Sequence, residues 1–470
     1  MKKKMCAGCR KETCDGCKWN LHKKIHTNKE ELLAEQPERI GKKDAGYGLV
    51  FDVGTTTVAG YLWDLQTGKC LCAQSCPNPQ RAFGNDVISR ISYCMGDDGA
   101  YVEEKQRKLQ QMIVQALDKM VEEFPVSAES VKTITRVVVV GNTVMCSILA
   151  GKSVEGLSRA PFKKPYEKSI REKGREFGFA GLSQAEIIIL PAIESYVGAD
   201  ALSVYNYVKR KDYRNNLLIV DIGTNGEIIL IGKEVYACST AAGPALEGAA
   251  VTQGMCATEG AIEAVSLVGN FPREDIYCKV IGNGKPEGIC GSGLVDALAL
   301  CREIGIIDAS GYLRSSEEAR RAGVRERICQ RIEQKNGERK ILLTTKEAPV
   351  YLTAEDIRQL QLAKGAVSAA VQLLLEKEGI TTEEISQIYL AGAFGSYINP
   401  ENAMKIGLLP KVEKEKIISL GNGAALGGSL ALFSENEIAE MQQDAEHIKH
   451  IELAREPMFE TYFMNGLSMP

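Results

Sequence analysis

The sequence predicts an α/β protein built from two lobes of similar topology, preceded by a small cysteine-rich module. The lobes are predicted by β-rich runs that alternate with helical segments and by a hairpin pattern that occurs twice. The module is predicted by a group of four cysteines at the start of the chain. A chain of 470 residues has room for several domains. The expected division is a head and linker at 1–43, a first lobe at 44–216, a second lobe at 217–435 and a tail at 436–470.

The composition is that of a globular enzyme, with 44% hydrophobic and 25% charged residues. The net charge of −4 gives no reason for nonspecific binding to nucleic acid or to an anionic membrane. No run reaches the roughly 18 apolar residues that a membrane span needs. Polar, cysteine-rich sequence follows the basic start, where a signal peptide has an apolar core. We expect a cytoplasmic protein with neither a membrane nor a nucleic-acid partner.

Each lobe is predicted to open on a three-stranded antiparallel unit whose first turn carries the pattern Asp-x-Gly-Thr. The expected strands are Tyr47–Val53, Val58–Trp63 and Cys70–Ser75 in the first lobe, and Leu217–Ile222, Glu227–Ile231 and Val235–Ser239 in the second. Further strands are expected at Thr135–Val140 and Ile385–Leu390, each leading into glycine.

Helices fill the intervals between the strands. Apolar residues at helical spacing predict a helix over Glu103–Glu122. A capping box at Thr353 and Asp356 predicts the start of a helix over Ile357–Leu374, and Gly379 lies just past its end. The highly charged stretch Ser315–Lys340 is expected to be a solvated helical insertion. The chain after Glu435 is acidic and amphipathic, and is expected to end in loose sequence.

The two Asp-x-Gly-Thr turns have the chemistry of a phosphate clamp. A glycine lets backbone N–H groups approach an anion closely, and a threonine adds a hydroxyl donor. A carboxylate repels phosphate, so an aspartate belongs there only if Mg²⁺ stands between them or if it positions a water or hydroxyl. One such turn is more simply a tight hairpin with a polar tip. Two turns with matched flanks favour a clamp on a triphosphate.

With their flanks, FDVGTTTVAGYLWD and LLIVDIGTNGEIIL resemble the two phosphate motifs of the superfamily that contains actin, sugar and acetate kinases and heat-shock chaperones. The segment Ile388–Ile398 resembles its adenosine motif, and Val137–Met145 and Gly421–Leu432 resemble its first and second connecting helices. The resemblance covers nearly the whole chain from Gly46. It implies a two-lobed actin-like (ribonuclease H-like) ATPase fold with ATP and Mg²⁺ as cofactors.

Within this superfamily, five segments resemble the reductive activators of corrinoid proteins. They are Asn78–Ile91, Gly141–Met145, Thr240–Met255, Ile289–Ala299 and Ala391–Ala403. Such activators couple ATP hydrolysis to the uphill one-electron reduction of Co(II) to Co(I) in corrinoid methyl-transfer proteins. The resemblance implies a corrinoid protein of a methyltransferase system as partner, a low-potential electron donor and a homodimer.

The same resemblance assigns the site residues. They are Asp52, Gly54, Thr55 and Thr56 in the first phosphate loop, Asp221, Gly223, Thr224 and Asn225 in the second, and Gly392, Ala393, Phe394 and Gly395 against the nucleoside. Asp221 is expected to orient the attacking water and Asp52 to hold the Mg²⁺ shell. Gly243 and Glu247 are further candidates, with a helix start and a solvated or capping carboxylate as the alternative. Cys290 is expected to be a packed thiol.

The head contains the pattern C-x₂-C-x₄-C-x₂-C, formed by Cys6, Cys9, Cys14 and Cys17. Structural zinc sites usually separate their two pairs by about 12–20 residues, so that a small fold forms between them. The shorter spacing favours an iron–sulfur cluster with four thiolate ligands, [4Fe–4S] before [2Fe–2S]. Zinc is the alternative, and free thiols are the third. Corrinoid activators begin with a plant-type ferredoxin domain, a linker and a middle domain, whereas this chain has a short head, a linker and then the ATPase.

The function predicted from these features is ATP-dependent, low-potential electron transfer from an iron–sulfur cluster to a corrinoid protein. The first alternative keeps the fold and makes the protein an activator of a 2-hydroxyacyl-CoA dehydratase-type enzyme. The second is a small-molecule kinase of the same superfamily with a structural zinc head. The third is a zinc-anchored nucleotide sensor without enzymatic activity.

Overall fold

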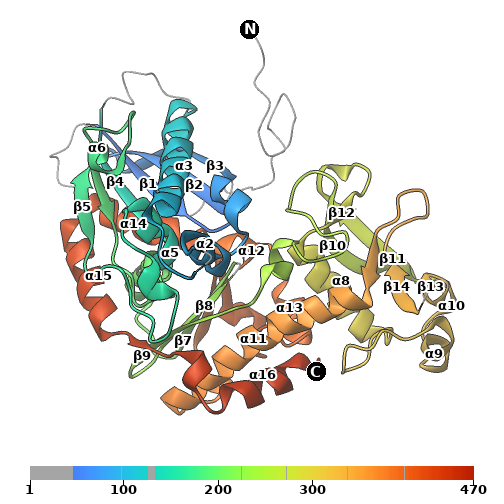
Figure 1. The fold of residues 1–470 in the computed structure, drawn as a ribbon. Coiled ribbons are helices and arrows are strands. Elements are labelled where there is room, and N and C mark those ends of the chain that lie inside the picture. The colour runs from blue at the N-terminus through green and yellow to red at the C-terminus, as the bar shows by residue number, and fades with distance from the viewer. Residues whose placement is uncertain are drawn as a thin grey trace, which may run out of the picture.

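The computed structural model describes residues 46–470 except 97, 125–132, 224, 271–272, 336 and 396. Within this part, two six-stranded sheets with helices packed on them form two lobes (Figure 1). No helix among the described residues combines the length and the apolar character needed to cross a bilayer. The four head cysteines and Thr224 lie outside the described residues.

The first sheet has the strand order β3-β2-β1-β4-β6-β5. Its first three strands are antiparallel, β4 runs parallel to β1, β6 runs parallel to β4, and β5 pairs antiparallel at the edge. The strands are β1 (Tyr47–Val53), β2 (Thr57–Asp64), β3 (Lys69–Pro77), β4 (Ile134–Gly141), β5 (Ile170–Lys173) and β6 (Glu186–Ile189).

The second sheet, in the order β17-β16-β7-β8-β9-β18, repeats this topology in five strands, and its sixth strand, β18, pairs in parallel with β9 at the opposite edge. Three antiparallel strands come first, and β16 and β17 are then added in parallel on the side of β7. Its strands are β7 (Leu217–Ile222), β8 (Gly226–Ile231), β9 (Val235–Thr240), β16 (Gln387–Ala391), β17 (Ile417–Gly421) and β18 (Lys449–His450). The prediction of two lobes with similar topology is confirmed.

Helices α3 (Glu103–Glu122) and α14 (Gly423–Phe433) cover opposite faces of the first sheet. A Cβ added at Gly60 would lie 2.6 Å from Met120 Sδ of α3, and one added at Gly48, on the opposite face, would lie 2.9 Å from Leu432 Cδ1 of α14. A helix from near the end of the chain therefore completes the core of the first lobe.

Helix α14 also packs closely along α7 (Ala199–Lys211), the helix that leads into the second lobe. A Cβ at Gly427 would lie 1.9 Å from the carbonyl oxygen of Ser203, so only glycine permits this approach. The interpretation of Val137–Met145 as the first connecting helix was wrong. The segment Val137–Met145 forms the end of β4 and the start of α5 (Thr143–Leu149), whereas the partner of α14 is α7.

The remaining helices of eight or more residues are distributed over both lobes. They are α2 (Val87–Cys94), α8 (Gly291–Glu303), α11 (Ala354–Glu378), α15 (Glu435–His447) and α16 (Phe459–Leu467). The shorter ones are α6 (Gly174–Phe177), α9 (Ser316–Arg321), α10 (Glu326–Cys329), α12 (Gly392–Gly395) and α13 (Pro400–Lys405).

Two small three-stranded sheets extend the second lobe on the side away from the first sheet (Figure 1). One contains β10 (Ala261–Val268), β11 (Asp275–Val280) and β12 (Gly288–Ile289), and the other β13 (Ile332–Lys335), β14 (Glu338–Leu342) and β15 (Tyr351–Thr353).

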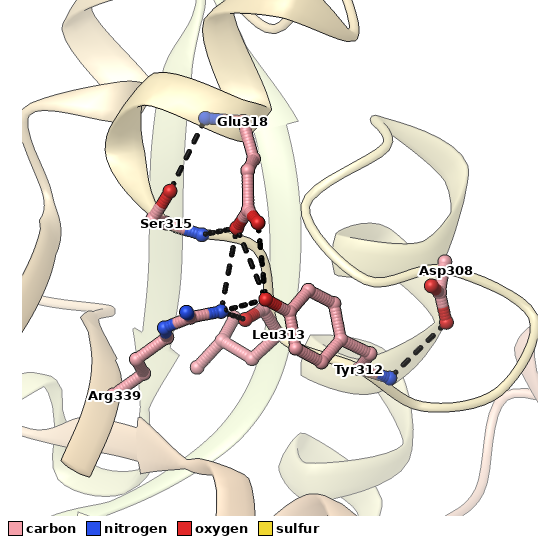
Figure 2. A network of polar contacts seen from close by, with 6 residues as sticks. All are labelled: Asp308, Tyr312, Leu313, Ser315, Glu318 and Arg339. Atoms are coloured by element: carbon pink, nitrogen blue, oxygen red, sulfur yellow. Dashed lines mark hydrogen bonds and ion pairs between the residues drawn. The ribbon is translucent and has the colours of Figure 1, made fainter. Parts of the chain in front are cut away.

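The charged stretch Ser315–Lys340 is only partly helical, which corrects the expected helical insertion. It contains α9 and α10 and then pairs β13 with β14. Polar and charged side chains of this stretch make specific contacts with one another, as Figure 2 shows. Ser315 and Glu318 form a capping box, and Arg339 of β14 forms an ion pair of 3.3 Å with Glu318. The sequence pattern of charges predicts exposure but not these partners.

The end of the chain is packed, which corrects the expected loose sequence. Helix α16 lies along α11, where Gly466 and Gly365 allow close approach. The buried Lys364 of α11 donates hydrogen bonds to the carbonyl oxygens of Gly466 at 2.6 Å and Ser468 at 2.7 Å. Met469 is buried in the core of the second lobe.

Candidate functional site

Asp52 lies near the end of β1, where the first phosphate loop begins. Its Oδ2 accepts a hydrogen bond of 2.7 Å from Asn422 Nδ2, at the N-cap of α14. Burial raises the pKa of Asp52 to about 6, and the Asn422 hydrogen bond limits this rise. This hydrogen bond therefore joins the first phosphate loop to α14, a helix from near the end of the chain.

Asp221 occupies the matching position near the end of β7. Burial raises its pKa to about 8, and the charges of Asp200 and Asp52 add to the rise. Directly across the hairpin from Asp221 lies Glu227, whose pKa is also raised by burial and by neighbouring carboxylates. The residue across from Asp52 in the first hairpin is Ala59, so the carboxylate pair belongs to the second lobe alone.

Asp200 joins this group and was missed by the sequence analysis. It is the second residue of α7, and burial together with the charge of Asp52 raises its pKa to about 7. Gly198 precedes the helix, and a Cβ there would lie 2.6 Å from Asp200 Oδ1. The available signal was an aspartate in the first turn of a helix that directly precedes the second phosphate motif.

The four carboxyl groups are the donor set that a hard divalent cation prefers. In the described part of the chain, no lysine or arginine forms an ion pair with Asp52, Asp200, Asp221 or Glu227. Like-charged carboxylates in one buried place raise each other's pKa unless a cation neutralises them. Oxygen ligands of this kind suit Mg²⁺, so the chemistry of these residues fits the expected metal, although three or more of them do not converge on one point as the side chains stand.

The predicted adenosine motif lies against the second phosphate motif. Ala391, at the end of β16, pairs with Asp221, and Gly392 turns the chain into α12 with φ of 80°. A Cβ at Gly392 would lie 2.5 Å from Asp221 Oδ1, so glycine is required at this contact. Ala393 and Phe394 lie in α12, and the carbonyl of Gly395 accepts a hydrogen bond of 3.0 Å from Ser419.

Glu247 contacts both phosphate loops. Thr56 Oγ1 donates a hydrogen bond of 2.9 Å to Glu247 Oε2, and a Cβ at Gly223 would lie 3.9 Å from Glu247 Oε1. The second loop is closed by a hydrogen bond of 2.9 Å from the amide of Gly223 to the carbonyl of Asn225. Gly243, with φ of 77°, begins the short helix that ends at Glu247.

Cys290 lies apart from the carboxylate group. Its thiol is buried and donates to the carbonyl of Ile262 at 3.3 Å, so the expectation of a packed thiol is confirmed. Among the described residues, no group of three or more histidine, cysteine, aspartate or glutamate side chains has the geometry to hold a metal ion as the side chains stand.

Comparison with known families identifies the fold around these residues. Residues 215–470, more than half of the chain, match the family model of the C-terminal domain of RACo, the ASKHA domain. The chain belongs to the RACo family. Residues 47–209 match the RACo middle region. The expected absence of a middle domain was therefore wrong, because the part interpreted as the first ATPase lobe is that region.

Named relatives of this RACo-family chain cover most of its length. The corrinoid activation enzyme RamQ of Eubacterium limosum is 36% identical over 429 residues, spanning 90% of this chain and 70% of that protein. The [Co(II) methylated amine-specific corrinoid protein] reductase of Methanosarcina barkeri is 27% identical over 458 residues, spanning 90% and 77%. A solved structure of a reductive activator for corrinoid, iron–sulfur protein superposes with a TM-score of 0.78 at 31% identity, covering 92% and 67%. The predicted actin-like α/β fold is confirmed.

Proposed function

We propose that the protein is an ATP-dependent reductive activator that drives the one-electron reduction of Co(II) to Co(I) in a corrinoid protein of a methyltransferase system. The observation that carries the proposal is that a RACo-family chain brings the matched Asp52 and Asp221 turns to the ends of corresponding strands, with the glycine turn at Gly392 packed against Asp221. The names of the relatives support corrinoid over the dehydratase-type and kinase alternatives.

ATP is proposed to bind between the two phosphate loops. Backbone amides and hydroxyls of Gly54–Thr56 and Gly223–Asn225 bind the phosphates, and Gly392–Gly395 lies against the nucleoside. Asp52 would hold Mg²⁺ through its water shell, and the bound ion would neutralise phosphate charge. Asp221 orients the water that attacks the γ-phosphate, which yields ADP and inorganic phosphate.

We add Asp200 to this proposed assignment. Its carboxylate comes from the start of α7, where the charge of Asp52 raises its pKa, and its own charge raises the pKa of Asp221. We place it beside the γ-phosphate end of the nucleotide, where it shares the positioning of water and ion. Glu227 lies across the hairpin from Asp221, and its raised pKa favours the neutral form until a cation neutralises the neighbouring carboxylates.

The electron path is proposed from the head. Cys6, Cys9, Cys14 and Cys17 would hold an iron–sulfur cluster, [4Fe–4S] before [2Fe–2S], which supplies one-electron redox chemistry when bound. A low-potential donor supplies the electron, and the corrinoid cobalt receives it. The protein is proposed to work in the cytoplasm, where thiolates stay reduced, and as a homodimer.

The direct test follows the cobalt optically under anaerobic conditions. The protein is mixed with a low-potential reductant and a Co(II) corrinoid protein, with Mg²⁺ and either ATP, ADP or a non-hydrolysable ATP analogue. Co(I) should form with ATP and not with the other two nucleotides. Equal formation of Co(I) with ATP and with ADP would show that hydrolysis does not drive the reduction and would overturn the proposal.

A further inference from the structure

Three successive carbonyl groups of the first phosphate loop accept hydrogen bonds from two residues of one neighbouring segment, Asn78 and Arg90. Asn78 Nδ2 donates to the carbonyl of Gly54 at 2.8 Å, and the backbone N–H of Asn78 donates to the carbonyl of Thr56 at 2.9 Å. Arg90 Nη2 donates to the carbonyl between them, that of Thr55. Both residues belong to Asn78–Ile91, a segment that resembles corrinoid activators and for which no role has been assigned so far.

These contacts fix the direction of the loop amides. In a planar trans peptide, the N–H of a residue points opposite to the C=O of the residue before it. With their preceding carbonyls turned toward Asn78 and Arg90, the amides of Thr55, Thr56 and Thr57 point away from these side chains. The Thr55 amide makes no hydrogen bond to another described residue. Successive amides that point to one side form an anion-binding concavity.

Arg90 is a fully buried cation that is satisfied by neutral groups. Its side chain is 0% exposed, and its other donors reach the carbonyl of Gly84 at 3.2 Å and Gln80 Oε1 at 3.3 Å. Burial lowers its pKa to about 10, so the guanidinium stays charged at neutral pH. A buried charge is costly unless something compensates it; the charge of Asp86 does so in part, and an anion on the far side of the loop would add to this.

The orientation of the Asn78 amide is fixed as well. The side chain is buried, and its Oδ1 accepts a hydrogen bond of 2.9 Å from the amide of Gln80, at the start of the short helix Pro79–Phe83. Because Oδ1 is engaged there, Nδ2 must face the carbonyl of Gly54. The segment is therefore rigid on the side that meets the loop.

We propose that Arg90 and Asn78 are positioning residues for phosphate binding. They hold the carbonyls of Gly54–Thr56 so that the loop amides face the nucleotide phosphates, and Arg90 adds a fixed positive charge behind the loop. This inference rests on the proposed nucleotide site at the same loop.

The test compares ADP with adenosine, which lacks phosphates, by calorimetric titration of the full-length anaerobic protein. Arg90→Met should weaken ADP binding by about tenfold or more, since a hydrogen bond to a charged group is lost together with the charge, and should leave adenosine binding unchanged. Arg90→Lys, which keeps the charge, should recover part of the loss. Gln106→Met is the matched control, because Gln106 is a buried side chain of the same lobe that donates to the carbonyl of Lys152 at 2.8 Å.

The possible outcomes distinguish failure of the proposed function from failure of the positioning role alone. If the wild-type protein binds neither ADP nor ATP, the proposed function fails. If wild type binds ADP and Arg90→Met binds ADP equally well, the positioning role is wrong. It is also wrong if Arg90→Met loses affinity for ADP and for adenosine to the same extent, which is the general effect that Gln106→Met controls for. Should Arg90→Met not fold, Asn78→Asp takes its place, because it keeps the acceptor for Gln80 and removes the donor to Gly54. It should lower ADP affinity selectively, and an unchanged affinity would overturn the inference.

Discussion

Asp52 on β1 is far in the sequence from Asp200 on α7 and Asp221 on β7, yet its charge raises the pKa of both. At the scale of single residues, the site is a group of acids whose pKa values are raised by burial and by one another. Such an arrangement costs stability in the absence of a cation. The arrangement is consistent with a site that binds and releases a divalent ion together with a phosphate chain.

The first prediction concerns Asp221→Asn. The variant should retain ATP binding and hydrolyse ATP about 10²–10⁴ times more slowly, because the amide cannot accept a proton from the attacking water. Calorimetry measures the binding and phosphate release measures the turnover. Asp64→Asn, at an exposed turn of the same fold, is the control and should match wild type. Unchanged turnover in Asp221→Asn would remove this residue from the mechanism.

The second prediction concerns pH and the stability of the nucleotide-free protein. The pKa of Asp221 is about 8 in the folded state, well above the ordinary value of 3.8. The folded protein therefore binds more protons than the unfolded chain across this range, and its free energy of unfolding falls as pH rises.

Denaturant unfolding at about pH 6 and pH 8 should show a larger loss of stability for wild type than for Asp221→Asn, which cannot ionise. The comparison between the two proteins removes the contribution of other titrating groups. Equal losses in both would mean that the folded state does not hold Asp221 protonated.

At the scale of elements, local signals predicted what is local. The strands Tyr47–Val53 and Leu217–Ile222 and the helix Glu103–Glu122 have the predicted bounds. The capping box of α11 at Thr353 is present, and the helix ends at Gly379 in the left-handed conformation. Periodicity, caps and glycine turns act over a few residues, so the sequence contains them directly.

Elements that depend on distant partners could not be predicted in the same way. Helix α7 is defined by its packing on α14, more than two hundred residues further on, and Asp200 could be recognised as a site residue only once that helix was placed. The hairpin β13–β14 is stabilised by contacts such as Arg331 with Asp275, which composition does not reveal. Glu227 was missed because the second hairpin has one residue fewer in its turn than the first.

The third prediction concerns the C-terminal segment Gly466–Pro470. Its removal should destabilise the protein by about 3 kcal/mol or more, because the buried Lys364 loses both carbonyl acceptors. Lys364→Met should destabilise the full-length protein and stabilise the truncated one. Denaturant unfolding of the four proteins measures this. The same sign for Lys364→Met in both backgrounds would contradict the assigned role of the lysine.

At the scale of the whole molecule, the two lobes resemble each other in strand topology, and one hydrophobic core contains residues of both. The two main sheets share one topology, and α14 from the second half completes the core of the first lobe. Relative movement of the lobes would alter the contact of Asn422 with Asp52 and of Thr56 with Glu247. Both contacts lie at the proposed nucleotide site, so we expect nucleotide binding there to be coupled to the arrangement of the lobes.

The fourth prediction concerns the head. Anaerobically purified protein should contain iron and sulfide in about equal amounts and no zinc, with an electron paramagnetic signal on reduction. Replacing Cys6 and Cys9 by serine should abolish both, whereas Cys72→Ser, on β3 of the first lobe, should leave them unchanged. Zinc without iron would defeat the redox interpretation of the head.

We propose that the two matched acidic turns, one in each lobe, close on a single magnesium-bound nucleotide. Calorimetric titration of the oxygen-free protein with ATP tests it most directly, with and without Mg²⁺ and in parallel with Asp52→Asn. The account predicts one site per chain, with affinity that depends on Mg²⁺ and is weakened in the variant. Absence of heat with every adenine nucleotide, or binding that is indifferent to both Mg²⁺ and Asp52, would contradict it.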